Sequence, residues 1–161
     1  MNSEVRIIDG YAGHWSLKRD LMKVLENHHD AQNRKTNVQA TMTEWMMNRN
    51  SQPVNDFKEY MLSSTNSKQV SDFWGNIYRK GDYAVKHDHT PNEHSVVYFL
   101  KSEPDFAPLI IGDFNDDKPF IINPLEGRMV IFPGTLKHSV PVHLSDKTRI
   151  TLAANLDVPT K

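Results

Sequence analysis

Residues 80–100 read KGDYAVKHDHTPNEHSVVYFL and place three histidines and an aspartate directly before an apolar run. Side chains alternate across a β-strand, so a strand over 83–89 would direct His87 and His89 to one face and Asp88 to the other. Two imidazoles on one strand face are suited to clamp a metal ion. Histidines with this spacing are also common on exposed strands and as hydrogen-bonded core residues, so the pair alone leaves metal binding open.

The sequence around this stretch predicts a mainly β protein of the α+β type. From Phe73 onward, short β-rich runs alternate with turn residues, a pattern typical of a sandwich or barrel. Seven or eight such strands predict a jelly roll. The predicted strands are 73–79, 83–89, 94–101, 108–114, 119–122, 128–133, 137–143 and 147–155.

The N-terminal part has a different character. Residues 1–72 predict a short strand near the start and then helices and loops that cover one sheet of a core formed by residues 73–156. A helix is expected from Leu17 to about His28, with Ser16 as its N-cap. Its apolar face would consist of Leu17, Leu21, Val24 and Leu25. No linker divides the chain, so residues 1–161 are expected to form one domain.

Composition narrows the classes of function. The chain has 161 residues, a formal net charge of −1 and no cysteine. Without cysteine, a disulfide framework, an iron–sulfur cluster and a thiolate zinc site are excluded, so any metal must be held by His, Asp or Glu. The near-neutral charge does not favour nucleic acid as a partner. With neither a signal-like start nor a long apolar run, the sequence predicts no membrane contact and a cytoplasmic location.

Two later stretches carry further candidate site residues. In EGRMVIFPGTLKHSVPV (126–142), a strand ends at Pro133 and His138 opens the next one. In KTRITLAANL (147–156), Arg149 and Thr151 share one strand face. An arginine that faces into a β-barrel must meet an anion, and a cross-strand ion pair with a residue such as Asp113 or Glu126 is the alternative.

In combination, these motifs resemble the iron(II)- and 2-oxoglutarate-dependent oxygenase superfamily, and within it a small subgroup with an H-x-H…H…R pattern. The resemblance covers roughly the C-terminal half of the chain, and it depends on the order and spacing of five motifs. They are Trp74-Gly75-Asn76, KGDY…HDH (80–89), SVVYFL (95–100), EGRMVIFP…HSV (126–140) and RITLAANL (149–156).

The resemblance implies a double-stranded β-helix that holds iron(II) through His87 and His138. The superfamily usually has a carboxylate at position 89, where this chain has His. Either His89 completes a three-histidine site, which strand alternation favours, or a bulge turns Asp88 inward. The catalytic metal ligands are therefore expected to be His87, His89 and His138, with Asp88 as the alternative to His89.

The resemblance also implies a site for 2-oxoglutarate. Arg149, with Thr151 two positions later, would bind the far carboxylate of this cosubstrate. Asn76 would bind its keto-acid end, and Tyr98 would add a hydroxyl to the far carboxylate if Tyr98, and not Phe99, faces inward. The implied reaction is a hydroxylase-type oxidation with dioxygen that forms succinate and carbon dioxide.

Two rival functions remain at this level. One is a cupin-type metalloenzyme that uses the same histidines without 2-oxoglutarate, and the other is a non-catalytic jelly-roll binding module. The direction of Arg149 distinguishes the oxygenase from the cupin, because only the oxygenase needs this side chain in the metal cavity. The sequence does not identify the substrate, which is a small molecule or a protein side chain, or the oligomeric state.

Overall fold

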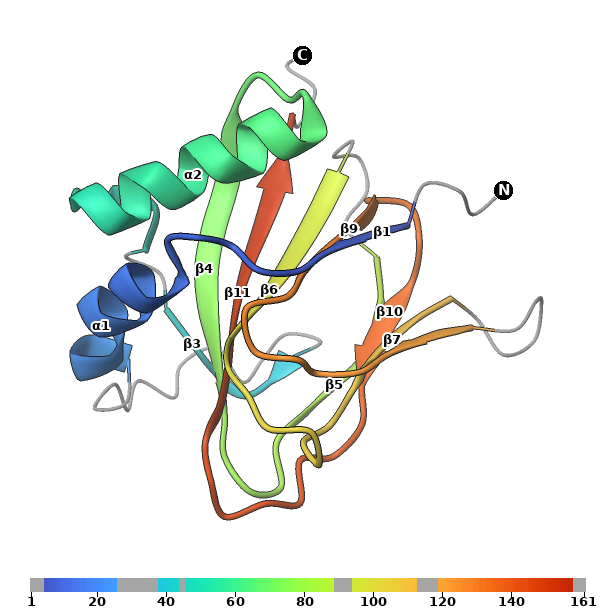
Figure 1. Ribbon diagram of the computed structural model, residues 1–161. Coiled ribbons are helices and arrows are strands. Elements are labelled where there is room, and N and C mark those ends of the chain that lie inside the picture. Colours follow the sequence, from blue (N-terminus) through green and yellow to red (C-terminus); the bar gives the residue numbers. More distant parts are fainter. Residues whose placement is uncertain (1–4, 26–37, 44–45, 89–93, 113–118, 158–161) are drawn as a thin grey trace.

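The computed structural model describes residues 5–25, 38–43, 46–88, 94–112 and 119–157, which form two antiparallel β-sheets and two α-helices (Figure 1). The helices cover one face of the larger sheet, and the smaller sheet packs against its other face. This arrangement confirms the predicted mainly β fold with N-terminal helices on one sheet.

The larger sheet has six strands. In spatial order they are β1 (Arg6–Ile8), β9 (Met129–Pro133), β6 (His94–Lys101), β11 (Arg149–Leu156), β4 (Val70–Tyr78) and β3 (Thr41–Met42). The smaller sheet has the order β2 (Val38–Gln39), β5 (Tyr83–His87), β10 (His138–Val140), β7 (Leu109–Ile111) and β8 (Phe120–Ile122). Every strand predicted from Phe73 onward corresponds to one of β4 to β11: 94–101 has the bounds of β6, and the others have displaced ends. Residues 89, 113 and 114 of two predicted strands lie outside the described residues. The N-terminal part also contributes β1, β2 and β3, so it extends both sheets as well as covering one.

The first helix, α1 (His14–Leu25), starts earlier than predicted. The amides of His14 and Leu17 donate to the carbonyls of Tyr11 and Gly13. Ser16 therefore lies inside the helix, and its assignment as N-cap was wrong. Of the predicted apolar face, the three leucines are fully buried, whereas Val24 is 37% exposed.

A second helix, α2 (Gln52–Thr65), follows a short 3₁₀ helix, η2 (Met46–Asn48). Ser51 caps α2, and Pro53 occupies its first turn, where the missing amide proton costs nothing. None of the helices in the described ranges is long and apolar enough to span a membrane.

Strand β11 divides the core into two layers. Ile150, Leu152 and Leu156 pack with the buried side of the helices. Arg149 and Thr151 point the other way, toward the smaller sheet, where they line a pocket. This alternation, expected for a strand buried on both faces, decides which side chains can reach the interior of the sandwich.

Candidate functional site

The pocket between the two sheets collects most of the residues that the sequence predicts for the site. About 470 Å³ of space lies between its lining atoms, the open mouth included. His87 and His138 line it from the smaller sheet, and Asn76, Arg149 and Thr151 line it from the larger one. Any ligand held by both groups would therefore bridge the two sheets.

His87 and His138 are cross-strand neighbours on β5 and β10, and the centroids of their rings lie 4.3 Å apart. The pairing is irregular, because Val140 lies opposite Ala84. Strand β5 has one residue more than β10 over this interval, which is a β-bulge. Ala84 and His87 consequently both line the pocket despite their odd spacing, while Val85 between them is exposed.

A hydrogen bond orients the ring of His87. Its Nδ1 lies 2.6 Å from the carbonyl oxygen of Val85, within the bulge. Because a carbonyl can only accept, Nδ1 carries the proton and Nε2 keeps its lone pair. Metal-binding histidines commonly donate their second ring nitrogen to such a carbonyl, so His87 is arranged to bind a metal through Nε2.

His138 is 6% exposed and packs edge-on against Phe132, with ring centroids 5.0 Å apart. It opens β10 directly opposite His87. An apolar wall beside two imidazoles limits access of water, and a metal held there would meet a dry environment.

Arg149 is fully buried at one end of this pocket. Its Nε donates to the carbonyl of Ala107 at 3.0 Å, and Cζ lies 4.6 Å from the ring centroid of Tyr78 and 5.4 Å from that of Phe99. Within the described part of the chain, its two terminal nitrogens have no hydrogen-bond partner. Burial lowers the pKa of Arg149, and the neighbouring Tyr78 opposes this shift.

Arg149 does not form the ion pair with Glu126 that the sequence offered as an alternative. That carboxylate lies on the other side of the larger sheet, where it accepts from Lys18 at 2.9 Å and from the Nε2 of His14 at 3.0 Å. The second candidate partner, Asp113, lies outside the described residues. The buried guanidinium thus offers two donors to the pocket, and an anion is the ligand that would satisfy them.

The β4–β11 register aligns four pocket residues in two cross-strand pairs. Arg149 is opposite Tyr78, and Thr151 is opposite Asn76. Asn76 is 6% exposed, and its Oδ1 is buried without a hydrogen-bond partner in the described structure. A polar ligand beside Arg149 would therefore also meet the amide of Asn76 and the hydroxyl of Thr151.

Tyr98 was predicted to reach the cosubstrate, and this prediction was wrong. Tyr98 packs under the helices, where its hydroxyl bonds to Nδ1 of His14, and Phe99 faces the pocket side instead. The sequence did not settle which of these adjacent residues points inward. Tyr78 supplies the aromatic hydroxyl on the pocket side, and burial raises its pKa while Arg149 acts in the opposite direction. Its position two residues after Asn76 on the same strand was the signal that sequence reasoning missed.

The third expected metal ligand belongs to the stretch that follows β5. His89 lies outside the described residues, and Asp88, which precedes it, is exposed. Among the described residues, no group of three His, Asp or Glu side chains is close enough to hold a metal ion. Of the expected ligands, the structure therefore brings His87 and His138 together, and the third is expected from Asp88 or His89.

Comparison with known proteins agrees with this geometry. Residues 111–155 match the family model described as "Putative 2OG-Fe(II) oxygenase". The match confirms the predicted resemblance, and its range contains His138, Arg149 and Thr151 but begins after His87 of β5. No curated protein matches the chain in sequence.

Solved structures with the same fold include several prolyl hydroxylases. A prolyl-4-hydroxylase from Pseudomonas putida superposes with a TM-score of 0.73 at 12% identity, covering 98% of this chain and 94% of the other. A Trichoplax adhaerens prolyl hydroxylase, in complex with a hypoxia-inducible-factor peptide, gives 0.73 at 14% identity, covering 96% and 83%. A viral collagen prolyl hydroxylase from Paramecium bursaria Chlorella virus-1, in a 2OG complex, gives 0.66 at 14% identity, covering 98% and 97%. These similarities confirm the double-stranded β-helix.

Proposed function

We propose that this chain is an iron(II)- and 2-oxoglutarate-dependent dioxygenase that hydroxylates its substrate and forms succinate and carbon dioxide. The observation that carries the proposal is Arg149, a buried cation whose terminal nitrogens have no partner in the described structure and which shares one pocket with His87 and His138. A buried charge of this kind is costly unless a ligand pairs with it. The far carboxylate of 2-oxoglutarate meets this requirement.

The iron ligands in this proposal are His87 through Nε2, His138 and His89, with Asp88 as the alternative to His89. The Val85 carbonyl fixes the tautomer of His87 with the proton on Nδ1, the form in which an imidazole binds a metal through Nε2. When bound, iron(II) supplies the activation of dioxygen, for which protein side chains have no equivalent. A three-histidine set would leave the charge of the metal uncompensated by protein, so the dianionic cosubstrate would bind more tightly when metal is present.

The cosubstrate residues in this proposal are Arg149, Thr151 and Asn76. The guanidinium fork matches a carboxylate in two parallel hydrogen bonds, which fixes the direction of the bound molecule as well as its affinity. Phe99 and Phe132 are fully buried beside the site and limit the entry of water. Tyr78 holds the guanidinium in place through its ring.

The position of Arg149 also separates this proposal from the cupin-type alternative. The oxygenase needs an arginine in its metal cavity to bind the keto acid, and Arg149 lies there. Glu126, one of the two ion-pair partners considered for Arg149, pairs with Lys18 and His14 instead. The arrangement therefore favours the oxygenase.

The central experiment is the anaerobic addition of iron(II) and 2-oxoglutarate to the purified protein. A visible metal-to-ligand charge-transfer band is expected for the wild type and not for His138→Ala. On admission of air, slow formation of succinate is expected even without substrate. A protein that binds iron but forms no succinate above the His138→Ala control would support the cupin-type alternative.

The ligand assignment has its own test. His87→Ala and His138→Ala are expected to abolish iron binding, because each removes a ligand and the remaining groups hold a labile ion poorly. Asp88→Asn is expected to keep the metal, since this side chain is exposed. If Asp88→Asn loses iron while His89→Ala retains it, the set is His87, Asp88 and His138 instead. Metal content after anaerobic gel filtration is the measurement.

A further inference from the structure

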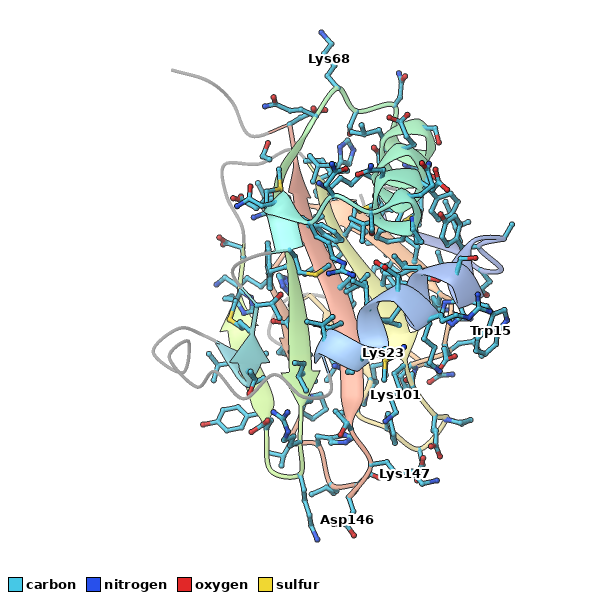
Figure 2. The ribbon with its side chains drawn as sticks, turned by 90° about the vertical axis from the view of Figure 1, so that its left-hand side faces the viewer. Trp15, Lys23, Lys68, Lys101, Asp146 and Lys147 are labelled. Atoms are coloured by element: carbon cyan, nitrogen blue, oxygen red, sulfur yellow. The ribbon has the colours of Figure 1, made fainter. Side chains whose placement is uncertain are left out.

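The end of the pocket away from Arg149 contains a second set of polar groups. The side chains of β11 that face the pocket are, in order along the strand, Arg149, Thr151, Ala153 and Asn155. The strand begins two residues after Lys147 and ends beside Gln69, whose carbonyl accepts from the amide of Asp157. In Figure 2, Lys147 and Asp146 lie at one end of the molecule and Lys68 at the opposite end. Asp157, two residues after Asn155, accepts from the amide of Lys68, so Asn155 belongs to the Lys68 end.

Asn155 is oriented by the carboxylate of Asp72, its direct neighbour on β4. The amide nitrogen Nδ2 lies 3.1 Å from Oδ2 of Asp72. A carboxylate only accepts hydrogen bonds, so the amide group must turn its NH₂ toward Asp72 and its oxygen away from it. That oxygen, Oδ1, is buried and has no hydrogen-bond partner among the described residues. Asp72 thus orients the amide group of Asn155 so that its Oδ1 is available to accept a hydrogen bond from a ligand.

Three further features shape this end of the pocket. Trp74 lines it from β4, opposite Ala153 on β11. The small side chain of Ala153 leaves space beside the indole. Asp72 does not line the pocket, but it is exposed and hydrogen-bonded to the lining residue Asn155, so its negative charge lies beside this end. An aromatic ring, a carboxylate and an amide oxygen thus belong to two cross-strand pairs, Trp74 with Ala153 and Asp72 with Asn155, which are successive on one face of the sheet.

The two ends of the pocket therefore have opposite chemistry. Arg149 offers two terminal NH₂ groups and a positive charge, whereas Asn155 offers an acceptor oxygen and its neighbour Asp72 a negative charge. The first end suits the dianionic cosubstrate. The second end suits a group that donates N–H hydrogen bonds, carries positive charge and stacks on an aromatic ring, which describes a guanidinium or an alkylammonium.

We propose that Asp72, Trp74 and Asn155 form a substrate subsite that binds an organic cation, a protonated amine or a guanidinium, next to the position that is oxidised. The inference rests on the proposed oxygenase function and adds the chemical class of the substrate to it. The cation would pair with Asp72 beside this end of the pocket, donate to Oδ1 of Asn155 and lie against the indole of Trp74.

The test uses two cationic probes, Nα-acetyl-arginine methylamide and Nα-acetyl-lysine methylamide, and a neutral isostere of the first, Nα-acetyl-citrulline methylamide. Blocked ends remove a free carboxylate that would compete at Arg149. Binding is measured by calorimetry or by ligand-observed NMR on the full chain, under anaerobic conditions with iron(II) and saturating 2-oxoglutarate. The comparison of arginine with lysine shows which cation the subsite prefers.

Asp72→Asn is compared with Asp146→Asn as the matched control. Both changes remove one exposed carboxylate, but Asp146 lies at the opposite end of the molecule, 3.5 Å from Lys80 (Figure 2). Asp72→Asn is expected to weaken the cationic probes about tenfold, as for loss of a charge-assisted contact at a partly open site. Asp146→Asn should change nothing, and Asn155→Leu should weaken both cations again. Higher salt should reduce the affinity of the wild type for both cationic probes.

The inference is overturned if the citrulline probe binds as tightly as the arginine probe, if Asp72→Asn and Asp146→Asn have equal affinities for the cations, or if neither cation binds in the millimolar range. Titration of 2-oxoglutarate alone keeps this outcome separate from the proposed function. If the protein binds 2-oxoglutarate through Arg149 but does not distinguish the probes, the cation subsite is refuted and the proposed oxygenase function stands. If the protein selects the cations but binds no 2-oxoglutarate, the proposed oxygenase function is refuted.

Discussion

At the scale of single residues, Arg149 best explains what the pocket is for. The protein buries this guanidinium completely, gives it one backbone carbonyl and two aromatic rings, and leaves its terminal nitrogens without a partner in the described structure. Such an arrangement destabilises the ligand-free protein, because a buried cation lacks its hydration. The cost is consistent with a side chain selected for binding an anion.

Arg149→Ala is expected to weaken 2-oxoglutarate binding by one to several orders of magnitude, since hydrogen bonds to charged groups contribute about 1.5–3 kcal/mol each. Arg149→Lys should recover only part of the loss, because a point charge cannot replace the guanidinium fork. The measurement is titration of 2-oxoglutarate into the iron-loaded proteins, with folding checked by circular dichroism. Iron affinity without cosubstrate should stay the same. Equal cosubstrate affinity in the wild type and Arg149→Ala would contradict the assignment.

Tyr98, in contrast to Arg149, is expected to contribute to the stability of the protein and not to cosubstrate binding. Its hydroxyl bonds to Nδ1 of His14, whose Nε2 donates to Glu126, so this chain of hydrogen bonds fastens α1 to the sheet. Tyr98→Phe is expected to lower the free energy of unfolding by about 1–3 kcal/mol, because Nδ1 of His14 loses its partner in a buried position. Denaturant unfolding measures this loss. The affinity for 2-oxoglutarate should not change. A clear loss of cosubstrate binding would show that Tyr98 contributes to the cosubstrate site after all.

At the scale of elements, the bulge in β5 decides how the metal strand presents its histidines. The extra residue between Ala84 and His87 brings both side chains to the pocket and leaves the carbonyl of Val85 pointing at Nδ1 of His87. Bulges are frequent beside functional sites for this reason, because they redirect one side chain without changing the rest of the sheet. Simple alternation of side chains, counted from Tyr83, therefore does not give the side of the sheet on which each residue of β5 lies.

The two helices are joined by a small polar cluster. Asp20 of α1 accepts from Nε of Arg49 at 3.0 Å and from the hydroxyl of Ser51 at 2.7 Å, and Ser51 also caps α2. The hydrogen bond from Arg49 lowers the pKa of Asp20 below its ordinary value of 3.8, against the opposing effect of burial, and Ser51 adds to the lowering.

This cluster predicts a pH dependence of stability. Because the pKa of Asp20 is lower in the folded than in the unfolded protein, its contribution is complete above about pH 4 and is lost as the pH falls through the folded-state pKa. Asp20→Asn is expected to lower the free energy of unfolding by about 1 kcal/mol at neutral pH and by less at acidic pH. Urea unfolding at several pH values tests this. An equal difference between the two proteins at every pH would show that Asp20 does not act through its charge.

At the scale of the whole molecule, the proposed ligands connect the two sheets. The histidines belong to the smaller sheet, and Arg149, Thr151 and Asn76 belong to the larger one. A metal with its cosubstrate would therefore hold the sandwich together from inside. A ligand that binds only the folded state stabilises it in proportion to the logarithm of its concentration over Kd.

The melting temperature is expected to rise when iron(II) and 2-oxoglutarate are added together anaerobically. At about 100 times Kd the stabilisation is about 2.7 kcal/mol, which corresponds to about 5–10 °C for a domain of this size. Arg149→Ala should keep the increase due to the metal and lose the increase due to the cosubstrate, and a chelator should reverse both. The absence of any further increase from 2-oxoglutarate in the wild type would contradict a ligand that bridges the sheets. Differential scanning fluorimetry is the measurement.

Several predictions from the sequence concern the whole chain and are not tested by the structure. They are the single domain over residues 1–161, its division at residues 72 and 73, and the cytoplasmic location. The contribution of β1, β2 and β3 to the sheets shows that the N-terminal part shares the β architecture.

The sequence by itself determined the mainly β class and the approximate ranges of the strands from Phe73 onward, which follow from alternating apolar residues and the turn residues between them. It also singled out the pocket residues His87, His138, Arg149, Thr151 and Asn76, through the resemblance of its motifs to the oxygenase superfamily. Only the tertiary structure decided which neighbour of a pair faces inward. Phe99 faces the pocket instead of Tyr98, the bulge turns Ala84 and His87 to one side, and Asp72 lies opposite Asn155, because strand register and bulges depend on pairing between residues far apart in the chain.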